Sequence, residues 1–240
     1  MEIEDFEKIF YKYIEDLKIK LNKEQIQKFY TYMNLLLEWN EKINLTAITK
    51  PDEIILKHFI DCLMITKYIK SNDKLIDIGT GAGFPGIPVK IHEEELKITL
   101  VDSLNKRLIF LEEVIKKLDL EGINVIHSRA EELGKNKIYR EKFDVVTSRA
   151  VANLSILAEY LLPLCKVGGR CICMKSADIE DELNNAKKAI EILGGKVIEK
   201  DIFSLPKSNI GRSIIVIEKV KNTPSKFPRK PGMPSKEPII

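Results

Sequence analysis

The sequence has no apolar run that approaches the roughly 18 residues needed for a membrane-spanning helix. It opens with acidic and aromatic residues rather than a basic stretch before an apolar one, which argues against secretion. Its four cysteines include no C-x-x-C pair, and Cys171 and Cys173 alternate along a predicted strand, as small core residues do. Internal repeats and low-complexity tracts are absent. We therefore expect a cytoplasmic protein with reduced thiols and no membrane contact.

Net charge gives little information by itself. The chain carries 39 Lys or Arg and 36 Asp or Glu residues, and a net charge of +3 is too small to indicate nucleic-acid binding. The distribution is more informative, because Lys219 to Ile240 contains six basic residues, one acid and five of the ten prolines. Proline-rich sequence fits neither a helix interior nor a central strand. This segment is either a solvated tail or an extended basic strap that contacts phosphates or lies back over the main domain.

The stretch Leu75–Gly86 (LIDIGTGAGFPG) is the most informative part of the chain. An apolar run predicts a buried strand, four closely spaced glycines follow, and helical sequence resumes at about Ile87 to Ile91. Glycine is needed where φ is positive or where a ligand approaches the backbone. A glycine-rich turn at the carboxyl end of a parallel strand is where open α/β sheets hold nucleotide-like ligands. The pattern predicts a cofactor-binding loop.

Two cofactors fit this loop to different degrees. Gly81–Gly86 satisfies G-x-G-x-x-G, and Asp102 lies about 20 residues further on, as in dinucleotide-binding proteins. Asp77, however, would face a pyrophosphate with like charge, whereas it suits the sulfonium and ammonium groups of S-adenosylmethionine. Pro85 and Pro88 also lie where a dinucleotide-binding helix would already have begun. The loop therefore favours S-adenosylmethionine over NAD.

The elements beyond this loop predict an α/β fold. The further predicted strands are Lys97–Asp102, Ile123–His127, Phe143–Thr147, Arg170–Lys175, Lys196–Phe203 and Ser213–Lys219. The predicted helices between them are Leu104–Leu118, Leu154–Leu162 and Ile179–Leu193. A turn at Gly168–Gly169 is expected before the fifth strand. This alternation indicates a Rossmann-like, seven-stranded and mostly parallel sheet, with the last two strands antiparallel at one edge.

The first 70 residues have a different pattern. Their aromatic and aliphatic residues recur at helical spacing, and a polar turn is expected at Trp39–Thr46. This pattern predicts a helical extension packed on the sheet domain. The expected organisation is therefore a helical extension at residues 1–70, a cofactor-binding domain at residues 71–220 and a basic, proline-rich tail at residues 221–240.

Several motifs resemble those of one known family. They are Trp39–Thr46 (WNEKINLT), His58–Asp61 (HFID), Asp77–Gly86 (DIGTGAGFPG), Arg129–Glu131 (RAE), Ser148–Ala150 (SRA) and Pro228–Lys236 (PRKPGMPSK). From about residue 40 to the end, the chain resembles the glucose-inhibited division protein B family, bacterial methyltransferases that modify guanine N7 in 16S ribosomal RNA. The resemblance implies S-adenosylmethionine as cofactor and 16S ribosomal RNA or the small ribosomal subunit as partner. We expect a monomer without a metal ion.

Roles for individual residues follow as hypotheses from their positions beside the loop and the strands. The residues expected to bind the cofactor are Asp77, Gly79, Gly81, Phe84, Asp102, Ala130, Glu131 and Arg149. Asp102 is expected to bind the ribose, Ala130 and Glu131 to read the adenine edge, and Phe84 to pack on the cofactor. Arg149 is expected to position the reactants at the mouth of the site. The candidates for contacts with RNA phosphates are Lys106, Arg107, Lys175, Arg212, Arg229 and Lys230.

The expected chemistry is undemanding. Guanine N7 has a lone pair and no proton to lose, so its methylation needs orientation rather than a general base. The segment Thr147–Ala150 contains neither a cysteine for attack on a pyrimidine nor an Asn-Pro-Pro-aromatic clamp for an exocyclic amine. His58 and Asp61 form either a structural hydrogen bond or part of the substrate cleft, and no third ligand completes a metal site. The alternatives are a small-molecule methyltransferase and, less favoured, an NAD-binding oxidoreductase.

Overall fold

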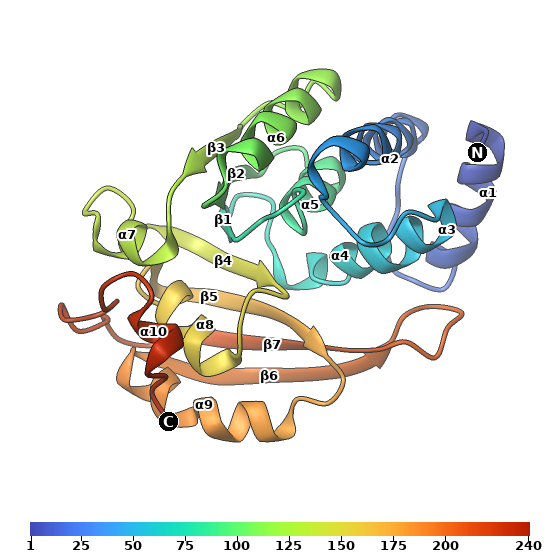
Figure 1. Cartoon of the computed structure of the whole chain (residues 1–240). Coiled ribbons are helices and arrows are strands. Elements are labelled where there is room, and N and C mark those ends of the chain that lie inside the picture. The colour runs from blue at the N-terminus through green and yellow to red at the C-terminus, as the bar shows by residue number, and fades with distance from the viewer.

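The apolar strands form one seven-stranded sheet in the computed structural model, which describes residues 1–240 (Figure 1). The strands are β1 (Lys74–Ile78), β2 (Lys97–Asp102), β3 (Ile123–His127), β4 (Phe143–Arg149), β5 (Cys165–Ser176), β6 (Gly195–Ser204) and β7 (Gly211–Lys219). Their order across the sheet is β3-β2-β1-β4-β5-β7-β6. The first five strands run parallel, and β7 lies antiparallel between β5 and β6. The predicted mostly parallel sheet with an antiparallel edge is confirmed.

Helices cover both faces of the sheet. Those of the sheet domain are α5 (Gly86–His92), α6 (Asn105–Lys117), α7 (Ala130–Lys135), α8 (Leu154–Leu161) and α9 (Glu180–Ile192). Successive residues of a strand point to opposite faces. Leu75 therefore joins the apolar core on the side of α5 and α6, and Ile76 joins the core on the side of α7, α8 and α9. The sheet is buried between two helical layers, as its parallel centre requires.

The N-terminal helices extend the core on the side of α5 and α6. They are α1 (Ile3–Ile14), α2 (Lys23–Ile43), α3 (Pro51–Ile54), a π-helical turn (Ile55–Ile60), α4 (Asp61–Leu63) and a 3-10 turn (Thr66–Tyr68). The ring of Phe29 lies 4.9 Å from that of Phe10 and 5.1 Å from that of Phe59, between centroids. All three rings are fully buried. Such pairs contribute about 0.5–1.5 kcal/mol each beyond the area they bury, so this aromatic cluster fixes the helical extension on the sheet domain.

The predicted polar turn at Trp39–Thr46 is wrong in its first half, because α2 continues to Ile43. The helix starts with a capping box, in which the side chain of Asn22 accepts a hydrogen bond from the Gln25 amide at 2.8 Å. It ends at Asn44, which adopts a φ of 46°, a left-handed conformation that asparagine tolerates better than most residues. Only the end of the motif, from Asn44 onward, is loop.

The predicted turn at Gly168–Gly169 is also wrong, because both glycines lie inside β5. Phe143 pairs with Cys165 and Val145 with Arg170, so the four residues Lys166–Gly169 oppose a single residue of β4. Gly168 takes a φ of 82° in this irregularity. A bulge therefore absorbs the extra residues, and β5 begins before the glycines rather than after them.

Residues 221–240, which we call the strap, fold back over the main domain. The guanidinium of Arg140 donates hydrogen bonds to the carbonyl oxygens of Thr223 at 2.7 Å and Phe227 at 2.8 Å. The strap then continues to a short helix, α10 (Met233–Lys236), which lies beside α8 (Figure 1). Of the two interpretations of this basic segment, the ordered strap is the one the structure shows.

Candidate active site

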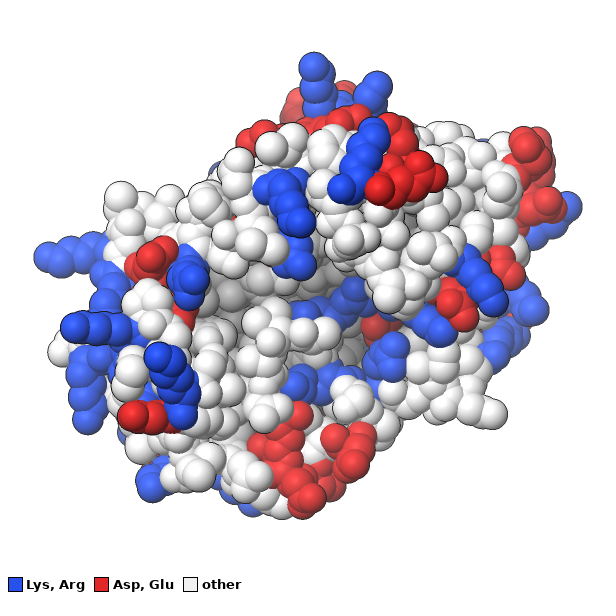
Figure 2. All heavy atoms as spheres, viewed as in Figure 1, with Lys and Arg blue, Asp and Glu red and all other residues white.

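A cavity of about 960 Å³ opens where the carboxyl ends of β1, β2 and β4 meet. Figure 2 shows the molecule hollowed on this face, with Lys and Arg side chains in and around the hollow. The Lys and Arg residues that line the cavity are Lys57, Arg107, Arg129, Arg149, Lys175 and Arg212. The Asp and Glu residues that line it are Asp61, Asp102 and Glu131. The volume is that of a small-molecule site, and the wall carries more positive than negative groups.

The loop after β1 presents bare backbone to the cavity at Gly81. This residue has a φ of 62°, and a Cβ atom there would meet nothing within 4 Å. Gly83 is different, because its Cβ would lie 2.5 Å from Ile87 Cδ1 and 2.8 Å from the hydroxyl of Tyr32. Gly79 also lines the cavity. The loop can therefore be approached by a ligand at Gly81, whereas Gly83 is required by packing.

Asp77 does not face the cavity, contrary to prediction. It is fully buried beneath the loop, where Oδ2 accepts hydrogen bonds from the Thr80 hydroxyl at 2.6 Å and the Gly86 amide at 3.0 Å. Its other oxygen has no partner. Burial is the main cause that raises the pKa of Asp77 to about 6. This carboxyl group joins the two ends of the glycine-rich loop and acts on a ligand only at a distance.

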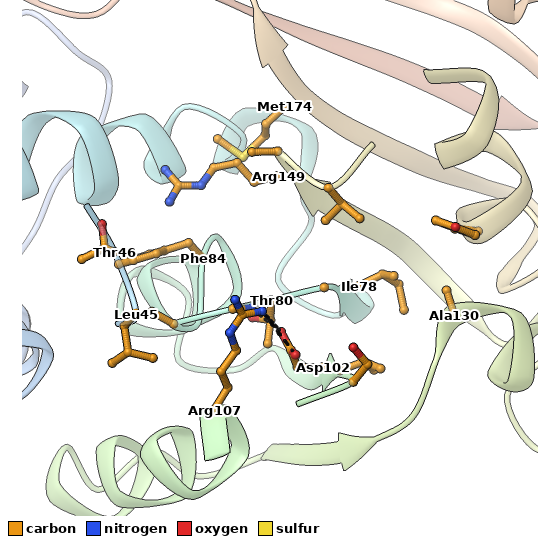
Figure 3. A pocket seen from close by; sticks show the side chains of 18 of the residues that line it. Leu45, Thr46, Ile78, Thr80, Phe84, Asp102, Arg107, Ala130, Arg149 and Met174 are labelled. Carbon is orange, nitrogen blue, oxygen red and sulfur yellow. Dashed lines mark hydrogen bonds and ion pairs between the residues drawn. The ribbon is translucent and has the colours of Figure 1, made fainter. Parts of the chain in front are cut away.

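Asp102, at the end of β2, lies beside Gly81 in the wall of the cavity. Its Oδ2 accepts the Gly81 amide at 3.0 Å, and its Oδ1 accepts the Leu104 amide at 2.9 Å. Arg107 Nη1 lies 3.1 Å from Oδ2 (Figure 3). Arg107, predicted to contact RNA phosphate, is therefore held inside the cavity by an ion pair with Asp102.

The strap forms part of the cavity wall near the start of α7. The Gly232 amide donates to Glu131 Oε1 at 2.9 Å, and the hydroxyls of Tyr160 and Ser235 are hydrogen-bonded at 2.9 Å. All four residues line the cavity, as does Ala130. Ala130 and Glu131 thus lie side by side in the cavity wall, and one carboxylate oxygen of Glu131 is already engaged by the strap.

Arg149 is held at the other end of the cavity rather than exposed at its mouth. Its guanidinium donates to the Lys57 carbonyl at 3.0 Å, to Asp61 Oδ2 at 3.3 Å and to His58 Nδ1 at 2.9 Å. It also lies over the ring of Phe84, 4.8 Å from the centroid. His58 and Asp61 do not bond to each other, and both hold Arg149 instead. Burial, followed by the charge of Arg149, lowers the pKa of His58 to about 3.

Two further RNA-phosphate candidates line the cavity and have carboxylate partners. Lys175 Nζ lies 2.5 Å from Glu182 Oε1 and donates to the Ala152 carbonyl at 2.8 Å. Arg212 Nε lies 3.3 Å from Asp61 Oδ2, the same oxygen that binds Arg149. Both cations can reach a phosphate only as members of these pairs.

The last three candidates lie outside the cavity. The guanidinium of Arg229 is bound by both oxygens of Glu159, with contacts of 2.7 to 3.1 Å, and Glu159 is buried. The assignment of Arg229 to RNA phosphate therefore finds no support, because its donors are used to hold the strap. Lys106 and Lys230 are exposed, and their side chains make no hydrogen bond or ion pair.

Sequence reasoning gave no role to Thr46, Tyr160, Gly232 or Ser235, all of which line the cavity. Thr46 ends one of the quoted motifs, and Gly232 and Ser235 belong to the proline-basic motif, so motif membership was a usable signal for three of them. Tyr160 carried no signal, because an aromatic residue in an apolar helix is indistinguishable from core.

The structure contains neither a cluster of metal ligands nor a membrane-spanning helix. No group of three or more His, Cys, Asp or Glu side chains gathers closely enough to hold a metal ion. No helix has the length and apolar character needed to cross a bilayer.

The strand order, the antiparallel β7, the glycine-rich loop after β1 and the carboxylate ending β2 together define a class I S-adenosylmethionine-dependent methyltransferase. Among solved structures, precorrin-6y C5,15-methyltransferase from Geobacter metallireducens has a TM-score of 0.50 at 16% identity, over 66% of this chain and 87% of that one. TYW2 from M. jannaschii in complex with AdoMet has a TM-score of 0.52 at 15% identity, over 85% and 80%. These similarities show the fold.

The chain belongs to the GidB family, the rRNA small subunit methyltransferases G, whose model matches residues 25–210. The ribosomal RNA small subunit methyltransferase G of Alkaliphilus metalliredigens is 51% identical over 227 residues, which cover 94% of this chain and 95% of that protein. The protein of the same name from Acetivibrio thermocellus is 56% identical over 222 residues, 92% and 91% of the two chains. The resemblance read from the motifs is confirmed.

Proposed function

We propose that this chain transfers a methyl group from S-adenosylmethionine to N7 of a guanine in 16S ribosomal RNA, and that it acts in the cytoplasm as a monomer. The proposal is supported by membership of the rRNA small subunit methyltransferase G family. It is also supported by the cavity, whose wall carries six Lys or Arg and three Asp or Glu residues. An excess of positive charge attracts a polyanion.

Four features of the cavity support the proposal that it holds the cofactor. Open space beside Gly81 admits a ligand against the backbone, and a side chain there would take up that space. The Asp102 carboxylate, adjacent to Gly81, can accept the two ribose hydroxyls. Ala130 and Glu131 lie at the start of α7, where a backbone amide and a carboxylate oxygen can pair with adenine. Phe84 offers an apolar surface at the far end of the loop.

In this proposal, each of the three segments of the chain supplies a different part of the cavity. The helical extension, residues 1–70, supplies Thr46, His58 and Asp61 to the end of the cavity away from α7. The sheet domain, residues 71–220, supplies the loop and carboxylate that hold the cofactor. The strap, residues 221–240, closes the wall beside Glu131. The base is expected to enter between the helical extension and the sheet domain.

The observation that carries the proposal is the state of the potential bases in the cavity. His58 has both ring nitrogens engaged and a pKa lowered to about 3, so it has no site for a proton near neutral pH. Asp61 and Asp102 are paired with arginines. The only histidine that lines the cavity is therefore not available as a base, which suits a target nitrogen that has a lone pair and no proton, as guanine N7 has.

The methyl transfer itself is balanced without any proton transfer. When S-adenosylmethionine is bound, the N7 lone pair forms the new N–CH₃ bond as the S–CH₃ bond breaks, the electron pair of that bond stays on sulfur, and the positive charge passes to the methylated guanine. Arg149 lies where it can orient the base, and its own charge is compensated by Asp61. This compensation limits repulsion of the positive charge that develops on the guanine. Orientation is therefore the main contribution expected from the protein.

The proposal is tested by incubating the chain with labelled S-adenosylmethionine and small subunits from a strain that lacks this activity. The expected product is a single N7-methylguanosine in 16S rRNA, mapped by borohydride reduction and aniline cleavage. Naked 16S rRNA and the large subunit serve as comparison substrates. Labelling at another atom, or only of a small metabolite added in competition, would refute it.

A further inference from the structure

Arg149 fixes the tautomer of His58. Its Nη2 lies 2.9 Å from His58 Nδ1, and a guanidinium can donate a hydrogen bond but cannot accept one. His58 Nδ1 is therefore the acceptor and carries no proton. Because the imidazole is neutral, its single proton lies on Nε2. The partly buried, permanently charged Arg149 thus determines the direction of the next hydrogen bond as well.

That next hydrogen bond ends on Thr46. His58 Nε2 lies 2.9 Å from Thr46 Oγ1 and donates to it, and the Ile48 amide donates to the same oxygen at 3.0 Å. A hydroxyl oxygen has two lone pairs, and both are now occupied. The hydroxyl proton has no acceptor in the protein. Thr46 is only partly buried and lines the cavity, beside Phe84 and at the end away from Ala130 (Figure 3).

An ordinary serine or threonine hydroxyl rotates and serves as donor or acceptor according to its partner. The hydroxyl of Thr46 cannot do so. To free a lone pair on its oxygen, His58 would have to stop donating from Nε2, and Arg149 prevents this by holding the proton of His58 on that nitrogen. The chain of contacts from Arg149 through His58 to Thr46 therefore presents a fixed donor to whatever enters the cavity at this end. A fixed donor distinguishes an acceptor from another donor, because two facing donors leave both unpaired.

We propose that Thr46 is a specificity residue that donates its hydroxyl hydrogen bond to O6 of the target guanine. The proposal rests on the proposed function, in which N7 is the methylated atom. Guanine presents O6 as an acceptor next to N7, whereas adenine presents an amino group at that position. With N7 directed at the methyl group, the neighbouring exocyclic group distinguishes the two purines, and the Thr46 hydroxyl can donate only to the 6-oxo group of guanine. His58 is the positioning residue behind it.

The first test leaves the protein unchanged and alters the substrate. Small subunits are reconstituted from ligated 16S rRNA that carries either guanine or 2,6-diaminopurine at the methylated position. The second base keeps N7 and the 2-amino group but replaces O6 by an amino group. The expected kcat/KM is about 10- to 100-fold lower for 2,6-diaminopurine. Equal values for the two substrates would overturn the proposal without reference to any variant. Failure of the guanine substrate itself would instead refute the proposed function.

The second test uses two variants of the same position. Thr46→Ser keeps the hydroxyl and is expected to keep the preference for guanine. Thr46→Val keeps the shape, removes the hydroxyl and is expected to bring the ratio of the two kcat/KM values close to one, mainly by slowing the guanine substrate. Titration with S-adenosylhomocysteine monitors the cofactor site, whose affinity should be the same in both variants. A Thr46→Val enzyme that binds S-adenosylhomocysteine normally and keeps the parent's preference would overturn the proposal.

Discussion

Arg229 and Glu159 form an ion pair that attaches the strap to the main domain. The guanidinium of Arg229 contacts both carboxylate oxygens of Glu159 at 2.7 to 3.1 Å, and the Arg229 amide donates to Oε1 at 2.7 Å. Glu159 is 1% exposed. Loss of one partner of such a pair leaves a buried charge uncompensated. Neighbouring Lys230 is exposed and has no partner, so the two adjacent cations have different roles.

This difference predicts that substitutions at the two adjacent positions affect different properties of the protein. Arg229→Gln should lower the free energy of unfolding by about 1–3 kcal/mol in a urea titration, because it leaves Glu159 without its charged partner. Lys230→Gln should leave unfolding unchanged but weaken RNA binding. If Lys230 contacts one phosphate, the slope of log K against log salt should fall by about 0.9 on duplex or about 0.7 on single strands. An unchanged salt slope for Lys230→Gln would remove it from the RNA-binding residues.

Gly81 and Gly83 should respond differently to the same substitution. Gly81→Ala places a methyl group in open space, at a backbone cost of about 1–2 kcal/mol for a left-handed residue, and should fold yet bind S-adenosylhomocysteine more than tenfold more weakly. Gly83→Ala should mainly lower the melting temperature, since its methyl group would overlap Ile87 and Tyr32. The two quantities are measured by calorimetric titration and thermal unfolding. Normal cofactor affinity in a folded Gly81→Ala protein would show that the ligand does not approach this backbone.

Asp102→Asn should weaken S-adenosylhomocysteine binding by about 1.5–3 kcal/mol, the range of a charge-assisted hydrogen bond. The asparagine oxygen can still accept the Gly81 or Leu104 amide, so the fold should survive. Asp144 lies near the start of β4, outside the cavity. Asp144→Asn is therefore the matched control and should not change cofactor affinity. If both variants bind the cofactor like the parent, Asp102 does not hold the ribose.

The rate of methyl transfer should be nearly independent of pH between about 6 and 9 in single-turnover measurements. A general base with an ordinary histidine pKa of about 6.5 would give a rate that rises with pH and levels off above that value. Burial lowers the pKa of His58 to about 3, so this imidazole stays neutral throughout the range and adds no slope. Arg149→Ala should lower the rate equally at every pH, because arginine orients and does not titrate.

His58→Asn is the sharper check on the same point. It should lower the rate, through loss of the contacts to Arg149 and Thr46, while leaving the shape of the pH profile unchanged. A parent profile that rises log-linearly with pH, together with a flat profile in His58→Asn, would make His58 catalytic and contradict the mechanism.

Local sequence patterns determined the architecture and the centre of the site. Alternating and continuous apolar runs specify strands and helices within a few residues, so the strands from Lys97–Asp102 and Ile123–His127 have the predicted bounds. The position of Asp102 beside Gly81 also follows from pattern, because the carboxyl ends of neighbouring parallel strands meet at one edge of the sheet. The two wrong predictions of secondary structure, at Trp39–Thr46 and Gly168–Gly169, concern polar residues and glycines that helices and bulges can accommodate.

Only the tertiary structure decided which charged side chains are free. Arg149 and His58 are 91 residues apart, and Arg229 and Glu159 are 70 apart, so no local pattern could pair them. Basic residues were predicted as phosphate contacts by type and position, yet Arg107 and Arg229 have carboxylate partners that the fold brings to them. Asp77 was assigned to the cavity although its strand buries it. Burial and the choice of ionic partner depend on elements far apart in the chain, because they are set by desolvation and distance in the assembled fold rather than by neighbours in sequence.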